Sequence, residues 1–116
     1  MRNAAFSRAF EGILRRLGRD ALLRGGAETT RVLVEYDVQM VGVLDDQQAS
    51  TSQTVAKFRA VDDPRPGDSL AIGRVEEGVF VEEERYRVDG PPLKADGVSV
   101  QVALLRVSVG GSATGL

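Results

Sequence analysis

Along the chain, the spacing of apolar residues changes once, from a helical period to a strand period. Between residues 3 and 24 they recur every three or four positions, as on one face of an α-helix. From residue 30 onward apolar and polar residues alternate, which is the period of a half-buried β-strand. Two glycines, Gly25 and Gly26, separate the regions. The pattern predicts an N-terminal helix followed by a β-domain.

The clearest strand signal is the stretch Arg65-Pro66-Gly67-Asp68-Ser69-Leu70-Ala71-Ile72-Gly73. Pro-Gly suits the two corners of a tight turn, and Leu70 and Ile72 then face the same side of a strand. Further strands are expected within residues 30–44, 54–60, 74–81, 85–88 and 98–107, with turns at 77–78, 89–92 and 95–97. Six to eight short strands at this spacing predict a mainly β fold, a small antiparallel β-barrel or sandwich with one N-terminal α-helix.

The chain divides into three parts by composition. Residues 1–26 form a basic amphipathic helix, residues 27–109 the β-barrel domain, and the glycine-rich residues 110–116 a flexible C-terminal tail. Within the domain, residues 45–53 contain no apolar residue larger than alanine, so we expect a mobile, exposed loop there. Such a loop is either a plain connection or a segment that becomes ordered on a partner.

Composition excludes much of enzyme chemistry. The chain of 116 residues contains no cysteine and no histidine, which removes thiolate and imidazole zinc sites, cysteine nucleophiles and histidine bases. The carboxylate pairs at 45–46 and 62–63 lack the further oxygen ligands that a calcium site needs. We therefore expect no enzyme activity, no cofactor and no metal. No apolar run approaches the roughly 20 residues of a membrane span, so we expect no membrane association.

Charge is unevenly distributed. Residues 1–25 carry six arginines and two acidic residues, a net +4, whereas the remainder carries nine basic and fifteen acidic residues, a net −6. A basic helix on an acidic body suits nucleic-acid binding, docking on an acidic partner, or a ring in which the basic face of one component meets the acidic face of the next. A merely solvated helix face remains the alternative.

The order of motifs resembles a known family. Val41-Gly42-Val43-Leu44-Asp45-Asp46 is followed by a strand at 55–59, the turn and strand at 65–73, Tyr86-Arg87-Val88-Asp89, an Asp96-Gly97 turn and a last strand that ends in Leu105-Arg106. Over residues 30–107 this resembles the small head–tail joining proteins, also called connector or stopper proteins, of long-tailed bacteriophages, the lambdoid type in particular. The chain departs from the family at residues 74–83, an acidic hairpin inserted before the aromatic strand.

The resemblance implies a virion structural protein in the neck between head and tail, made in the host cytoplasm. It implies a homo-oligomeric ring that binds the portal or a head-completion adaptor above and a tail-terminator or tail-tube protein below, with DNA passing through the lumen without specific binding. Two alternatives stay open: a tail-terminator or tail-tube cap, and, in another class, a small β-barrel module that binds nucleic acid or a ligand. The candidate partner-binding residues are Arg15, Arg16 and Arg19 of the helix, Asp45, Asp46, Gln47, Gln48, Ser50, Thr51 and Ser52 of the loop, and Glu76 and Glu77 of the acidic hairpin.

Overall fold

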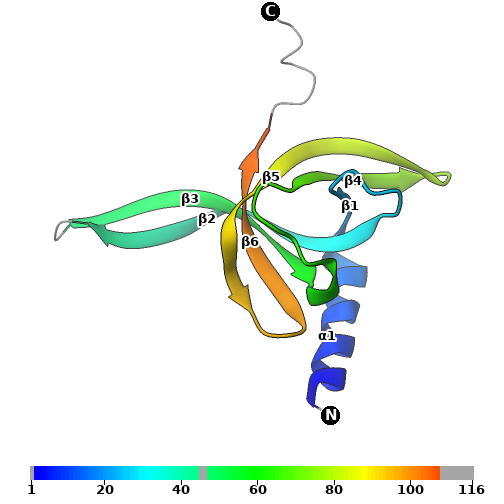
Figure 1. Cartoon of the computed structure of the whole chain (residues 1–116), viewed down its shortest axis with the longest axis horizontal. Helices are drawn as coiled ribbons and strands as arrows, with labels where there is room; N and C mark the ends of the chain where they lie inside the picture. The colour runs from blue at the N-terminus through cyan, green and yellow to red at the C-terminus, as the bar shows by residue number, and fades with distance from the viewer. Residues whose placement is uncertain (1, 45–46, 108–116) are drawn as a thin grey trace, which may run out of the picture.

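The chain folds as a closed antiparallel β-barrel with an α-helix at its N-terminus (Figure 1). The computed structural model describes residues 2–44 and 47–107. The elements are α1 (Arg2–Leu17), β1 (Arg19–Leu23), β2 (Thr30–Leu44), β3 (Gln47–Arg59), the short 3-10 helix η1 (Ala60–Asp62), β4 (Ser69–Glu76), β5 (Val79–Ala95) and β6 (Ser99–Arg106). The predicted mainly β fold with one N-terminal helix is confirmed.

The strands follow the order β1-β2-β3-β6-β5-β4 around the barrel, and β1 pairs with both β2 and β4 to close it. Closure leaves the barrel without a free edge. Every strand contributes alternate side chains to one core, and aliphatic residues dominate that core, as the low aromatic content requires. The core residues are Ala21, Val32, Ala56, Phe58, Leu70, Ile72, Tyr86, Val88, Val102 and Leu104.

The turn before β4 has the predicted geometry. Gly67 has a positive φ of 88°, and the Asp68 N–H donates to the Arg65 carbonyl oxygen at 3.0 Å, which closes a four-residue turn. The Asp68 carboxylate accepts hydrogen bonds from the Arg65 N–H and from the Arg24 guanidinium, both at 2.8 Å. The turn therefore also anchors the connection between β1 and β2.

The helix is shorter than expected. It ends at Leu17, and residues 19–23 form β1 instead of its last turns, so Arg19 and Ala21 belong to the barrel. Gly18 permits the change of direction: a Cβ there would lie 2.5 Å from the Leu14 carbonyl oxygen and 3.1 Å from that of Val32. The prediction of a helix up to residue 24 was wrong because pairing with β2 and β4 outweighs the helical spacing of residues 21–24.

Within the loop that we expected at residues 45–53, residues 47–53 are a strand instead. Residues 47–53 form the first half of β3 and pair with residues 38–44 of β2 through seven register positions, from Val38↔Gln53 to Leu44↔Gln47. Main-chain pairing makes this polar segment a strand, although its side chains show no strand pattern. The candidate residues Asp45 and Asp46 lie outside the described residues, as does the tail at 110–116. We call residues 38–44 with 47–53 the β2–β3 arm.

A second hairpin extends beyond the barrel. Residues 74–76 of β4 pair with residues 79–81 of β5, and we call residues 74–81 the β4–β5 arm. In Figure 1 this arm and the β2–β3 arm reach out on opposite sides of the barrel, and α1 extends below it. The turn that we expected at residues 89–92 is wrong, since β5 continues through it with a shift of register between Asp89 and Lys94.

Candidate interaction surfaces

The candidate partner-binding residues fall in three places. Arg15 and Arg16 lie exposed at the C-terminal end of α1. Thr51 and Ser52 are exposed on the β2–β3 arm, where Gln47, Gln48 and Ser50 take part in the ladder. Glu76 and Glu77 lie at the tip of the β4–β5 arm. Arg19 is separate from all three, since β1 places it in the barrel wall.

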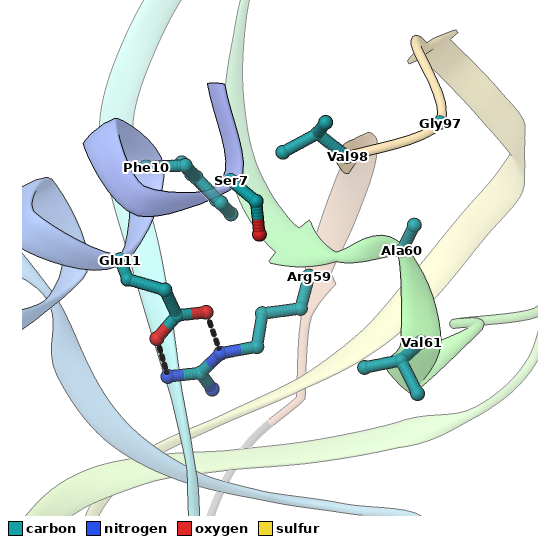
Figure 2. A pocket seen from close by; sticks show the side chains of 8 residues that line it. All are labelled: Ser7, Phe10, Glu11, Arg59, Ala60, Val61, Gly97 and Val98. Atoms are coloured by element: carbon teal, nitrogen blue, oxygen red, sulfur yellow. Dashed lines mark hydrogen bonds and ion pairs between the residues drawn. The ribbon is translucent and has the colours of Figure 1, made fainter. Parts of the chain in front are cut away.

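An ion pair fastens the middle of α1 to the barrel. The Arg59 guanidinium, at the end of β3, donates to the Glu11 carboxylate from Nε at 2.5 Å and from Nη2 at 2.7 Å (Figure 2). It also donates to the Thr30 hydroxyl at 2.9 Å. The hydrogen bonds from Arg59 hold the pKa of Glu11 below its ordinary value, and those to Glu11 raise the pKa of Arg59. The pair borders a hollow of about 420 Å³, lined also by Phe10, Val61 and Val98.

A second arginine caps the end of the helix. The Arg31 side chain, from β2, donates to the carbonyl oxygens of Leu14, Arg15 and Gly18, with its shortest bond, 2.9 Å, to Gly18. Helix carbonyls at this end lack partners within the helix, and a cation there also suits the helix dipole. At this end of the helix the Arg31 side chain binds backbone carbonyl oxygens, and the side chains of Arg15 and Arg16 remain exposed. Among the described residues, neither Arg8 nor Arg16 has an ion-pair partner.

The β4–β5 arm has a defined turn at its tip and a close approach of its strands at its base. Glu77 and Gly78 both have positive φ, 50° and 80°, as a two-residue type I′ hairpin turn requires. Arg74 pairs with Glu76 at 2.6 Å and also with Glu83. A Cβ on Gly73, at the base of the arm, would lie 1.9 Å from the Val81 carbonyl oxygen, so the strands approach too closely there for any other residue. The arm therefore presents its tip in a defined position.

Next to the base of this arm, two tyrosines meet one carboxylate. The Glu84 carboxylate accepts from the hydroxyls of Tyr86 at 2.7 Å and Tyr36 at 2.8 Å, and from Arg19 at 3.4 Å. Burial opposes ionisation of Glu84, but these donors outweigh it and lower its pKa. Burial, followed by the bond to Glu84, raises the pKa of both tyrosines. The two protonated tyrosines and the ionised Glu84 thus link β2 to β5 through hydrogen bonds. The pKa of each of these three groups moves away from 7, whereas an acid–base catalyst needs a pKa near the working pH.

Tyr36 reaches this cluster because β2 is irregular there. By simple alternation along the strand, Tyr36 would share a face with Val32, which is buried. The register shifts between Glu35 and Val38, and Asp37 has a positive φ of 52°. A bulge of this kind turns the strand and re-aims the neighbouring side chain, so Tyr36 is exposed and binds Glu84 from outside. Alternation alone gives no signal for such a bulge.

A groove that sequence reasoning missed lies on the other flank of α1. It encloses about 520 Å³ between the helix and the sheet formed by β3 and β6. Phe10 and Leu14 of the helix are buried against the barrel, whereas Phe6 is 62% and Leu17 67% exposed. The apolar face of the helix thus extends beyond the part that the barrel covers. The lining residues are Phe6, Ala9, Phe10, Ile13, Lys57, Asp96, Val98 and Ser99.

Neither a scan against protein-family models nor a search of curated proteins found a match for this chain. Within residues 2–44 and 47–107, no three acidic side chains gather where they could hold a metal ion. In the same part of the chain, no helix has the length and apolar character needed to cross a bilayer. Function must therefore be argued from the shape and chemistry of the surfaces.

Proposed function

We propose that this protein is a virion structural protein that forms a ring joining the DNA-filled head of a long-tailed bacteriophage to its tail. The observation that supports this best is the pair of hairpin arms extending from opposite sides of a small closed barrel (Figure 1). Such arms suit a subunit that contacts neighbours on two sides. The ring binds the portal or an adaptor on one face and the tail on the other.

The β2–β3 arm is built to be stabilised by a partner. Its strands pair through seven positions, about 20 Å of strand, and β3 joins β6 only from Thr54 onward. No other strand of the described residues pairs with the arm. A two-stranded hairpin alone is at best marginally stable in water. Contact with a neighbouring subunit or with the portal would supply the missing stabilisation and would order the arm in the assembly.

The distribution of charge fits the passage of DNA. Outside residues 1–25 the chain is acidic, with a net charge of −6 from nine basic and fifteen acidic residues. A lumen lined by an acidic body repels the DNA phosphates, so that DNA slides through the ring without specific binding. The basic helix then faces protein rather than DNA.

Shortening the β2–β3 arm tests this function. Replacement of residues 40–51 by Asn-Gly gives a two-residue turn after the Gln39↔Ser52 pair and leaves the pairing of β3 with β6 intact. In a phage that depends on this gene, we expect a folded barrel and separate, unjoined heads and tails by electron microscopy. A second variant keeps the arm length and changes only the candidate residues, Thr51→Ala and Ser52→Ala, and so separates the contribution of these two hydroxyl groups from that of the arm itself.

Three outcomes would contradict the proposal. Normal joined virions from a gene knockout would exclude a role in joining. Tails of abnormal length in the knockout would favour the tail-terminator alternative. Tight, salt-sensitive DNA binding by the purified protein that is weakened by Arg15→Ala and Arg16→Ala would favour the nucleic-acid-binding module.

A further inference from the structure

The groove beside α1 is an apolar surface with a basic border. On its helix side, Phe6, Ala9 and Ile13 present apolar atoms, and Phe6 is 62% exposed. Arg16 lies three residues after Ile13 and is therefore its neighbour on the helix surface, exposed and without an ion-pair partner among the described residues. Lys57 stands on the β3 side. The groove suits a short segment that is apolar and acidic.

The one acidic side chain in the groove does not reverse this preference. Asp96 lies in the β5–β6 turn, and its Oδ1 accepts hydrogen bonds from the backbone N–H groups of Val98 at 2.9 Å and Ser99 at 2.8 Å. These bonds hold its pKa below the ordinary value, and the charge of Lys57 acts in the same direction. Its charge is thus directed at the turn that it stabilises, and Arg16 is left for an incoming carboxylate.

The tip of the β4–β5 arm has the matching chemistry. Val79 is 63% and Val75 43% exposed, and Glu76 and Glu77 stand between them in the sequence. Glu76 is already paired with Arg74, whereas Glu77 has no ion-pair partner among the described residues. The type I′ turn and the ion pairs favour the observed conformation of the arm, which reduces the conformational entropy that docking would cost.

The tip does not meet this groove within one molecule. In Figure 1 the β4–β5 arm points sideways from the barrel and α1 points below it. An occupant with this chemistry therefore comes from a second chain. A tip and a groove at different places on the surface make a heterologous contact, which repeats from copy to copy and closes into a ring when the rotation allows.

We propose that the tip of the β4–β5 arm of one copy docks into the groove beside α1 of the next copy, with Val79 against Phe6 and Ile13 and Glu77 against Arg16. The contact rests on the proposed ring and names the surfaces that would form it. It also gives a role to the acidic hairpin by which the sequence departs from the family it resembles. The tip is small, so the contact is weak in the free protein, and a covalent cross-link is needed to detect it.

A pair of cysteines provides this cross-link, because the natural chain contains none. In the purified variant Ala9→Cys/Val79→Cys, mild oxidation joins the tip of one copy to the groove of the next. We expect a ladder of dimers, trimers and larger species on a non-reducing gel. The control variant Arg8→Cys/Val79→Cys moves the helix cysteine to the side of α1 away from the groove. A ladder no stronger than that of the control overturns the proposal.

Exchange of charges gives a second, independent test. In the cysteine background, Arg16→Glu alone and Glu77→Arg alone should each reduce the ladder by about fivefold, because like charges then meet in the contact. A mixture of the two variants should restore it, since each tip then finds an opposite charge in the other copy. Glu28→Arg, a charge reversal at an exposed position outside the proposed contact, should leave the ladder unchanged. No recovery in the mixture overturns the pairing of Glu77 with Arg16.

This contact and the proposed function can fail separately. If the ladder is absent but a gene knockout still separates heads from tails, the contact is wrong and the function stands. If the ladder forms but knockout virions are normal, the chain self-associates in this way and the head–tail function is wrong.

Discussion

Replacing Arg31 with methionine tests how α1 is held onto the barrel. The guanidinium donates to three carbonyl oxygens at the end of the helix and pairs with Asp20 at 3.2 Å. A hydrogen bond of this kind contributes roughly 0.5–1.5 kcal/mol, or more when one partner is charged. The side chain is 32% exposed, so water replaces part of what is lost. We expect Arg31→Met to lower the free energy of unfolding by about 2–3 kcal/mol.

Urea unfolding followed by circular dichroism measures this loss. Arg16→Met removes an exposed arginine from the same helix end and should change stability by no more than about 0.5 kcal/mol. Arg31→Lys should recover less than half of the loss, because one ammonium group cannot reach three carbonyl oxygens in the way that a planar guanidinium does. A loss below about 1 kcal/mol for Arg31→Met, or an equal loss for Arg16→Met, would refute a stabilising role of the cap.

Two further predictions concern the base of the β4–β5 arm and the pH dependence of stability. Gly73→Ala should lower the free energy of unfolding in urea by at least about 2 kcal/mol, because its Cβ would meet the Val81 carbonyl oxygen at 1.9 Å. Gly12→Ala, with open space around it in the helix, should instead raise the free energy of unfolding by up to about 1 kcal/mol. Equal effects of the two substitutions would contradict the close approach at Gly73. Since Arg59 lowers the pKa of Glu11 below 4.5, ionised Glu11 stabilises the fold above that pH, and this contribution is lost on acidification. The gap in melting temperature between the natural protein and Glu11→Gln should therefore be widest near neutral pH and shrink as the pH falls below the ordinary pKa of a glutamate. A gap that stays constant over this range would show that the ion pair does not contribute.

The acidic hairpin, the basic end of α1 and the groove beside α1 were predictable from the sequence to different degrees. The acidic hairpin at Glu76 and Glu77 lies where the turn signal at 77–78 places it, because a Glu-Gly pair between alternating residues is a local pattern. The basic residues Arg15 and Arg16 are exposed on the helix as its spacing implies. The groove was not predictable, since half of its lining comes from β3 and from the β5–β6 hairpin, far from α1 in the sequence.

By itself the sequence determined some of the strands, such as those around Leu70 and Tyr86, and which way their side chains face. Leu70 and Ile72 are buried together, as are Tyr86 and Val88, because alternation along one strand assigns its two faces without reference to any neighbour. The Pro66-Gly67 turn follows from the backbone preferences of those two residues. These features depend on contacts within a few residues, and such contacts are visible in a sequence.

Only the tertiary structure decided the features that depend on strand pairing and that the side-chain pattern does not indicate. Residues 19–23 are a strand because β2 and β4 lie on both sides of them, and without that closure their spacing is equally helical. Residues 47–53 are a strand because residues 38–44 pair with them, although the segment contains no apolar residue larger than alanine. In the first case, main-chain pairing with β4, which lies far along the chain, outweighs the helical side-chain pattern. In the second case, the pairing is within one hairpin, and main-chain hydrogen bonds form the strand without an alternating side-chain pattern.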